Sequence, residues 1–239
     1  MTQDRVKILV DNSVRHHAVE HKGVWGDHGA VMWGGEAGIP VKTGRMLSKA
    51  APIHIAPERG GAQGGYIASL AIAHLNGAWE AYTSDALLFE RLHHPSGKYV
   101  GNFGGFSWFN KINFKNNSTL EGFTASIPSE IEPIDALKQF LSSCANSEYQ
   151  KIRSGLESCG AKKSSQDAWH IFCVDLLGLD KFLTCDAKLI GQIRSMRDKG
   201  LRQRILDIVV LPVQACEAMG LDAATQEERE YLRQTLGPF

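Results

Sequence analysis

The stretch that decides the fold is DAWHIFCVDLLGLDKFLTCDAKLI, residues 167–190. Its first half predicts a mostly buried helix over 167–179, because the apolar residues run nearly without interruption for more than three helical turns. KFLTCD, residues 181–186, follows as a short strand that ends in an aspartate. A helix and a strand in close succession are typical of folds that alternate the two around a parallel sheet. The stretch therefore predicts an α/β fold with Asp186 at the end of one strand.

The same alternation extends to both sides of this stretch. Strands are expected at 6–10, ending at Asp11, at 79–84 and at 207–212, where a proline ends the last one. Helices are expected over residues 66–77, 85–94, 133–144 and 147–160. The pattern predicts a single domain over 1–239 with a three-layer sandwich architecture, in which a mainly parallel central sheet lies between layers of helices.

Two segments interrupt the alternation and are interpreted as insertions, at about 15–65 and 95–131. Residues 23–65 are rich in glycine and have little periodicity, which indicates a long insertion or loop. Within the second segment, FSWFNKINF (106–114) has apolar residues at 106, 108, 112 and 114. This spacing is close to the period of two that a strand shows, so it predicts an inserted hairpin.

Composition excludes several function classes. Lys and Arg together number 26 and Asp and Glu also number 26, so no overall charge attracts nucleic acid, and any such binding needs a local patch. The five cysteines lack CxxC spacing and lie mostly in apolar runs, which is typical of reduced interior residues. No apolar run approaches the roughly 18 residues of a membrane span, and the N-terminus lacks a signal-peptide pattern. We expect a cytoplasmic protein with no membrane partner.

Acidic side chains stand where a site would form in such a fold. Asp11 and Asp186 end two expected strands, Asp167 opens the helix before the second of them, and Glu90 lies on the helix after 79–84. Because ligands gather outside the carboxyl ends of parallel strands, these four carboxylates are expected to converge. A partly buried acidic cluster repels itself unless a cation neutralises it. Hard oxygen ligands favour Mg²⁺ or Mn²⁺ over zinc.

Three stretches resemble the PIN-domain metal-dependent ribonucleases. They are KILVDNSV (7–14), TSDALLFERL (83–92) and, most specifically, residues 167–190, where DAxH opens an apolar helix and TxD ends the next strand. The segment DIVVLPVQACEAMG (207–220) resembles the closing strand and helix of that family. The resemblance covers about half of the chain, which is longer than the family's domain.

The resemblance implies a PIN-like fold and hydrolysis of phosphodiester bonds in single-stranded RNA, with Mg²⁺ or Mn²⁺ as cofactor. It implies that the catalytic and metal-binding residues are Asp11, Glu90, Asp167 and Asp186. It also implies that Ser13 and Thr184 support the first and last aspartates. An RNA substrate is expected, while an inhibitory protein partner and a homodimer remain open.

The second acid of the set is left open by the sequence. The separation of Asp11 from Glu90 is unusually long for the family, so Asp85 and Glu80 are alternatives to Glu90. Glu80 is the weaker of the two because it lies on the expected strand itself. Each aspartate also has a simpler interpretation, since Asp167 suits a helix N-cap and Asp186 a turn after a strand. His170 is expected in the core or behind the ligands, and Cys185 to be buried and inert.

Two other functions compete with the nuclease. A PIN-like module without activity would bind RNA or protein through the same fold. A zinc peptidase is suggested by His17, Glu20 and His21, which form HxxEH, a motif that places two histidines on one helical face. The simpler interpretation of these residues is a polar loop with incidental histidines.

Candidate RNA contacts lie just after the last acid. Six basic residues fall between 188 and 204, and a basic helix there would bind the phosphate backbone, with Arg194, Arg197 and Lys199 as contacts. A solvated helix face explains the same pattern equally well. The aromatic residues of FSWFNKINFK could stack on bases, but their spacing favours burial in the core.

Overall fold

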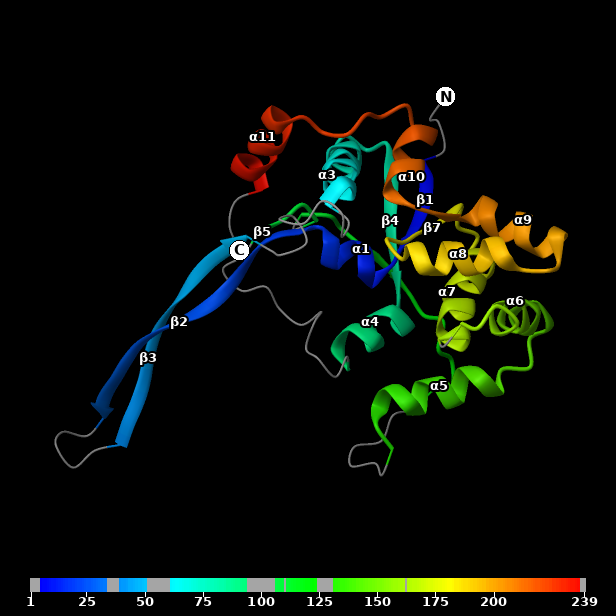
Figure 1. The fold of residues 1–239 in the computed structure, drawn as a ribbon, viewed down its shortest axis with the longest axis horizontal. Coiled ribbons are helices and arrows are strands. Elements are labelled where there is room, and N and C mark those ends of the chain that lie inside the picture. Colours follow the sequence, from blue (N-terminus) through cyan, green and yellow to red (C-terminus); the bar gives the residue numbers. More distant parts are fainter. Residues whose placement is uncertain are drawn as a thin grey trace.

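The structure, a computed structural model, describes residues 5–33, 39–50, 61–93, 106–109, 111–123, 131–161 and 163–236. At its centre is a five-stranded sheet in which every pair of neighbouring strands is parallel (Figure 1). In order across the sheet the strands are β6 (Lys115–Asn117), β4 (Trp79–Ser84), β1 (Val6–Val10), β7 (Lys181–Leu183) and β8 (Val209–Val210). The α/β fold with a mainly parallel sheet, predicted from the alternating pattern, is confirmed.

Helices pack against both faces of this sheet. One face is covered by α1 (Asn12–His17), α3 (Gly61–Leu75), α10 (Pro212–Ala218) and α11 (Gln226–Leu236). The other is covered by α4 (Asp85–Leu92), α5 (Pro133–Ser143), α6 (Ser147–Glu157), α7 (Ser164–Leu176), α8 (Ala187–Ser195) and α9 (Lys199–Ile208).

Strand β1 lies between the two hydrophobic cores. Its side chains alternate, so that Leu9 packs with the helices of one face while Ile8 and Val10 pack with those of the other. All three are buried, as expected for the middle strand of a parallel sheet covered on both sides. No helix in the described part of the chain combines the length and the apolar character needed to cross a bilayer.

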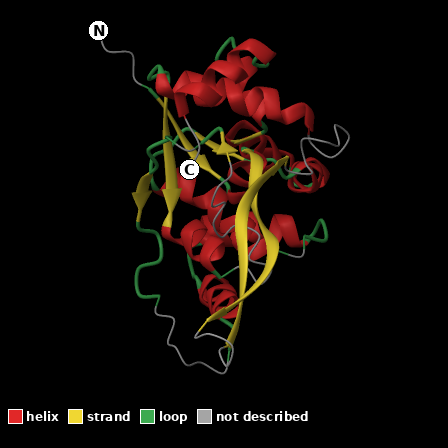
Figure 2. Ribbon diagram, turned by 90° about the vertical axis from the view of Figure 1, so that its left-hand side faces the viewer, coloured by secondary structure: helices red, strands yellow, loops and turns green. Residues whose placement is uncertain are grey.

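The glycine-rich segment that the sequence indicates as a loop is largely a β-hairpin. Strands β2 (Val19–Trp33) and β3 (Ile39–Ala50) pair antiparallel, from His21 opposite Ala50 to Trp33 opposite Ile39. The hairpin extends away from the helices and from the parallel sheet (Figure 1), and it lies on the side of the molecule that faces the viewer in Figure 2. The apolar pattern of the sequence did not predict these two strands, because most of the hairpin does not lie against the main sheet. Its residues therefore need no alternation of apolar and polar side chains. Residues 34–38 and 51–60 of this insertion lie outside the described residues.

The hairpin expected around residues 106–114 is wrong. Strand β5 (Phe106–Ser107) pairs antiparallel with β2, whereas β6 joins the edge of the main sheet beside β4. The apolar spacing instead reflects burial, because Trp108, Phe109 and Ile112 belong to the core beneath α1 and α3. The interpretation of the aromatic residues as core residues is therefore confirmed for Trp108 and Phe109. Residues 94–105, 110 and 124–130 of this second insertion lie outside the described residues.

The observed ends of several helices and strands differ from the predicted ones, because local hydrogen bonds lengthen or shorten the elements that the apolar pattern predicts. Helix α3 begins at Gly61 rather than 66, and α7 begins at Ser164, three residues before Asp167. Strand β7 stops at Leu183, before the expected end at 186. Helix α9 continues to Ile208 and takes the first two residues of the strand expected at 207–212.

Candidate functional site

The connections of β1 and β7 create a topological switch point at the centre of the sheet. These strands are neighbours, and along the sequence the next strand of this sheet after β1 lies on one side of the pair, while the strand after β7 lies on the other. The helices that leave them also separate, since α1 packs in one core and α8 in the other. In open α/β sheets, ligands bind at this kind of switch point, outside the carboxyl ends of the strands.

Asp11 stands directly at this position. Its backbone N–H donates to the carbonyl of Leu183 at 2.9 Å, which continues the pairing of β1 with β7. Its carboxylate oxygen Oδ2 accepts hydrogen bonds from the hydroxyls of Thr184, at 2.8 Å, and of Ser13. The ends of the two central strands thus hold the first acid in a fixed orientation.

The same hydroxyls connect Asp11 to Asp186. Ser13 Oγ accepts from the backbone N–H of Cys185 at 3.0 Å, and Thr184 Oγ1 accepts from the N–H of Asp186 at 3.0 Å. Asp186 in turn caps α8, because its Oδ1 accepts from the N–H groups of the second and third residues that follow it. Capping occupies one carboxylate oxygen and leaves Oδ2 without a hydrogen bond to the described residues.

Asp167 is not the helix cap that the sequence suggests. Helix α7 begins three residues earlier, and its N-cap position is Lys163, so Asp167 lies in the first turn. Its carboxylate makes no hydrogen bond or ion pair with any described residue. The pKa of Asp167 is raised to about 7. Burial is the largest cause; the nearby carboxylates of Asp11, Glu90 and Asp186 also raise it, while His170 lowers it. The other three acids of the set thus all act electrostatically on Asp167.

Glu90 reaches this group from α4. Ser84 Oγ accepts from the N–H of Leu87 and begins that helix, which places Glu90 beside α7. There Glu90 Oε1 accepts from Gln166 Nε2 at 2.9 Å and lies 3.0 Å from His170 Nε2. Burial alone would lower the pKa of His170, but the adjacent Glu90 carboxylate raises it overall.

The two alternatives to Glu90 point elsewhere. Asp85 is the acceptor for the segment at 118–120, with Thr119 N–H at 2.9 Å and Leu120 N–H at 3.0 Å. Burial raises the pKa of Asp85, but these hydrogen bonds outweigh it and lower the pKa overall. Glu80 pairs with Lys115 at 2.8 Å. Of the three candidates, only Glu90 acts electrostatically on Asp167.

The four carboxylates supply the hard oxygen donors that Mg²⁺ and Mn²⁺ prefer. In the part of the chain that the structure describes, no lysine or arginine pairs with Asp11, Asp167 or Asp186. In the same residues, however, no three His, Cys, Asp or Glu side chains are arranged to hold a metal ion. The donor chemistry fits a divalent cation, and coordination by three of these groups requires their side chains to move closer together.

The zinc-peptidase motif is not supported. Helix α1 ends at His17, with Ala18 at its C-cap, and β2 begins at Val19. His17 and His21 therefore belong to a helix and a strand and do not share a helical face. The geometry that HxxEH requires is absent because the chain turns between the two histidines.

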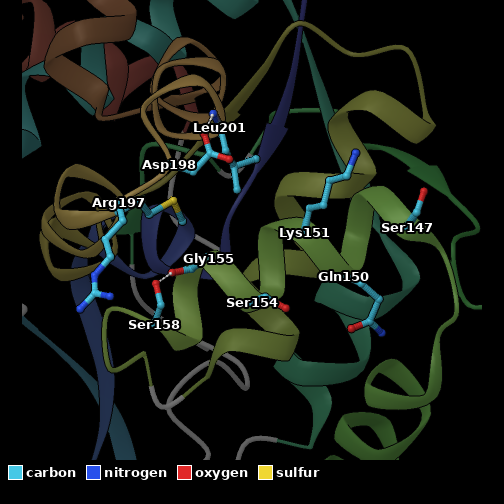
Figure 3. A pocket seen from close by; sticks show the side chains of 10 residues that line it. Ser147, Gln150, Lys151, Ser154, Gly155, Ser158, Arg197, Asp198 and Leu201 are labelled. Carbon is cyan, nitrogen blue, oxygen red and sulfur yellow. Dashed lines mark hydrogen bonds between the residues drawn. The ribbon is translucent and has the colours of Figure 1, made fainter.

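The basic stretch after Asp186 is two helices and not one. Arg194 lies in the last turn of α8, Arg197 in the turn that follows, and Lys199 at the start of α9, and all three are exposed. Arg194 is eight residues from Asp186, or about 12 Å along the helix. A cavity of about 670 Å³ lies here between α6 and the α8–α9 turn, lined by Lys151, Arg197 and other residues but by none of the four acids (Figure 3).

Sequence reasoning missed Gln166. Gln166 and His170 are four residues apart and bind Glu90 from one face of α7, so helical spacing from the histidine could have found the glutamine.

No family model matches this chain, and comparison with curated proteins and with solved structures finds no similar protein. The class that the fold and the site define is an α/β fold with a parallel sheet and acidic side chains after its two central strands.

Proposed function

We propose that the chain has a PIN-like, three-layer architecture with two insertions and acts as a metal-dependent endoribonuclease on single-stranded RNA. The order of the acidic motifs supports this, as do the helices on both faces of the parallel sheet. The proposed site lies at the ends of β1 and β7, where the aspartates of the first and last motifs share the hydroxyls of Ser13 and Thr184.

The observation that supports the proposal most is that this group of acids lowers the stability of the folded chain. A partly buried carboxylate that three others repel, with no basic partner among the described residues except the histidine on Glu90, destabilises the folded chain. Clusters of strongly shifted titratable groups in a crevice mark functional sites more often than structural ones. A bound divalent cation would neutralise the repulsion among the carboxylates, and this relief would favour binding of the cation.

Each residue then has a distinct role. Asp11, Asp167 and Asp186 would hold Mg²⁺ or Mn²⁺, and Glu90 would complete the set or orient the attacking water. A bound divalent ion lowers the pKa of water and stabilises charge on the phosphate and on the leaving oxygen. Ser13 and Thr184 fix the carboxylate of Asp11, so that little reorganisation is needed on that side of the site.

The second candidate function is a PIN-like module that binds RNA or protein without cleaving it. It is favoured by the lack, among the described residues, of three side chains placed to hold a metal, and by the pairing of Glu90 with His170. Loss of metal binding with retention of the fold would distinguish this candidate from the nuclease.

The test is cleavage of a fluorescent single-stranded RNA by the full chain in Mn²⁺, in Mg²⁺ and in EDTA. Asp11→Asn and Asp186→Asn should each lower the rate by at least about 100-fold, because each removes a proposed ligand. Asparagine still caps a helix, so the second variant keeps α8 intact and changes mainly the charge. Cleavage in EDTA, or full activity in both variants, contradicts the proposal.

A further inference from the structure

Two side chains of α7 hold one carboxylate oxygen of Glu90. Gln166 Nε2 donates to Glu90 Oε1 at 2.9 Å, and His170 Nε2 lies 3.0 Å from the same oxygen. Both donors are buried, and only 17% of the Glu90 side chain is exposed. Hydrogen bonds to an ionised group are strong where water is kept away. The two donors therefore fix the Glu90 carboxylate in one orientation.

The ring of His170 has no second hydrogen-bond partner. An ionised carboxylate only accepts hydrogen bonds, so the ring nitrogen Nε2 carries the proton that joins it to Glu90. The other ring nitrogen, Nδ1, is buried and makes no hydrogen bond to any described residue. A buried polar ring with a single partner is placed for that partner, which here is Glu90.

Helical spacing places this contact beside Asp167. Gln166 and His170 are four residues apart on α7, and Asp167 and His170 are three apart. Residues at these spacings are neighbours on a helix surface, with about 5–6 Å between their Cβ atoms. Glu90 reaches the same two donors from α4, so its carboxylate meets α7 next to Asp167.

Two other acids of the set are held in the same way. Asp11 is held through Oδ2 by the hydroxyls of Ser13 and Thr184, and Asp186 through Oδ1 by backbone N–H groups of α8. In both, the second oxygen makes no hydrogen bond to a described residue, and the same is true of Glu90 Oε2. Carboxylates that bind metal ions are supported by donors in this manner.

We propose that Gln166 and His170 are positioning residues, which hold Glu90 Oε1 so that Oε2 stays available to a divalent cation, directly or through a water molecule. The proposal rests on the metal-dependent ribonuclease function and adds to it the two residues that keep the fourth acid in place. Neither residue binds the cation or the RNA itself, so each acts through Glu90.

The experiment is calorimetric titration of Mn²⁺ into the full chain without RNA. His170→Met removes one donor but keeps an apolar contact with Phe182, whose ring centre lies 6.0 Å from that of the histidine. His170→Gln keeps an N–H donor, and Gln166→Met removes the other donor. Gln150→Met is the matched control, because Gln150 Nε2 donates to the carbonyl of Cys144 on the far side of α7 from these acids, beside a cavity that none of them lines. Thermal unfolding of each variant is recorded in parallel.

His170→Met and Gln166→Met should each weaken Mn²⁺ binding about tenfold, because donors behind a metal ligand commonly contribute this much to affinity. His170→Gln should retain most of the affinity, and Gln150→Met all of it. In a chain that already carries Glu90→Gln, His170→Met should weaken binding no further, because its effect passes through Glu90. A merely structural role predicts the opposite, since methionine suits a buried position better than glutamine and its effect would not depend on Glu90.

Wild-type Mn²⁺ affinity in folded His170→Met and Gln166→Met would overturn the proposal, as would an equal further loss in the Glu90→Gln chain. Gln166→Met supplies the answer by itself if His170→Met does not fold.

The outcome is separable from that of the ribonuclease proposal, which RNA cleavage tests. Mn²⁺ binding that depends on Gln166 and His170, without any cleavage of RNA, refutes the nuclease and leaves the positioning role standing. Cleavage in Mn²⁺ with unchanged Mn²⁺ affinity in both variants refutes the positioning role alone. A wild-type chain that binds no Mn²⁺ refutes both.

Discussion

Asp167 carries most of the physical argument at the scale of single residues. Its carboxylate is partly buried in the first turn of α7, lacks a hydrogen bond from the described residues, and is repelled by three other acids. Natural proteins keep such a group at the expense of stability where function needs it. The consequence can be measured without knowing the substrate.

Replacing Asp167 by asparagine should stabilise the metal-free protein, and the gain should depend on pH. The pKa is about 7 in the folded chain and about 4 in the unfolded chain, so stability falls as pH rises through this range. In EDTA, Asp167→Asn should exceed wild type by about 2 kcal/mol near pH 8 and equal it below about pH 4. Urea unfolding across pH measures this, and a variant less stable than wild type at high pH would contradict the account.

Substitutions of Asp85 and Glu90 should have different effects, on stability for Asp85 and on cleavage for Glu90. Asp85→Ala leaves the N–H groups at 119 and 120 without their acceptor and should cost about 1–3 kcal/mol of unfolding free energy, with cleavage by the folded fraction preserved. Glu90→Gln should keep the fold and lose cleavage. Denaturant unfolding and RNA cleavage measure the two effects, and the reverse assignment would show that Asp85 is the second acid.

At the residue scale the sequence singled out Asp11, Glu90 and Asp186, which all act electrostatically on Asp167, while their joining into one site stays a prediction. Asp11 and Asp186 were found because strand ends of a parallel sheet share one edge. The choice between Asp85 and Glu90 could not be made, because it depends on which way α4 presents each side chain. That orientation is set by the contacts of Asp85 with residues 118–120, which are remote in sequence.

Elements with strong local signals formed as predicted. β1 and β4 have the expected bounds, and Gly77 follows α3 with φ of +76°, a conformation that favours glycine. The hairpin of β2 and β3 was not predicted, because the two strands pair mainly with each other. Such strands need no alternating apolar pattern that the sequence would reveal. The start of α7 was misplaced because Asp167 is a good cap residue that the chain does not use as a cap.

Two glycine substitutions, at Gly77 and Gly191, should change the free energy of unfolding in opposite directions. Gly77→Ala forces a left-handed conformation on alanine and brings Cβ to 3.3 Å from Arg5 Nη2, so it should cost about 1–2 kcal/mol. Gly191→Ala lies inside α8 with open space around the new methyl group and should gain about 0.5–1 kcal/mol. Urea unfolding of both variants tests this, and equal effects would contradict the assignment of the two conformations.

At the scale of the molecule, the sheet between two helical cores is separate from the projecting hairpin. Beyond His21, the described strand β2 pairs only with β3. The parallel sheet is built from other strands, and the described residues of the two cores come from other elements, with Ala18 at the base of the hairpin among them. We therefore expect the hairpin to be an addition to the fold.

Excision of the outer hairpin should leave the domain folded. A chain in which residues 22–49 are replaced by a short Gly-Ser linker should melt within about 4 °C of wild type and keep its near-ultraviolet circular dichroism. Loss of the cooperative transition would show that the ribbon supports the cores, contrary to the arrangement seen here.

The central claim is that four acids far apart in sequence form one cation site at the switch point of the sheet. Calorimetric titration of Mn²⁺ into the full chain tests it most directly, with Asp167→Asn as the variant and Asp175→Asn, an exposed residue on the same helix, as the control. Wild type and Asp175→Asn should bind Mn²⁺ equally, and Asp167→Asn should lose most of the binding. If wild type and Asp167→Asn bind Mn²⁺ equally, or if neither binds it, the claim is contradicted.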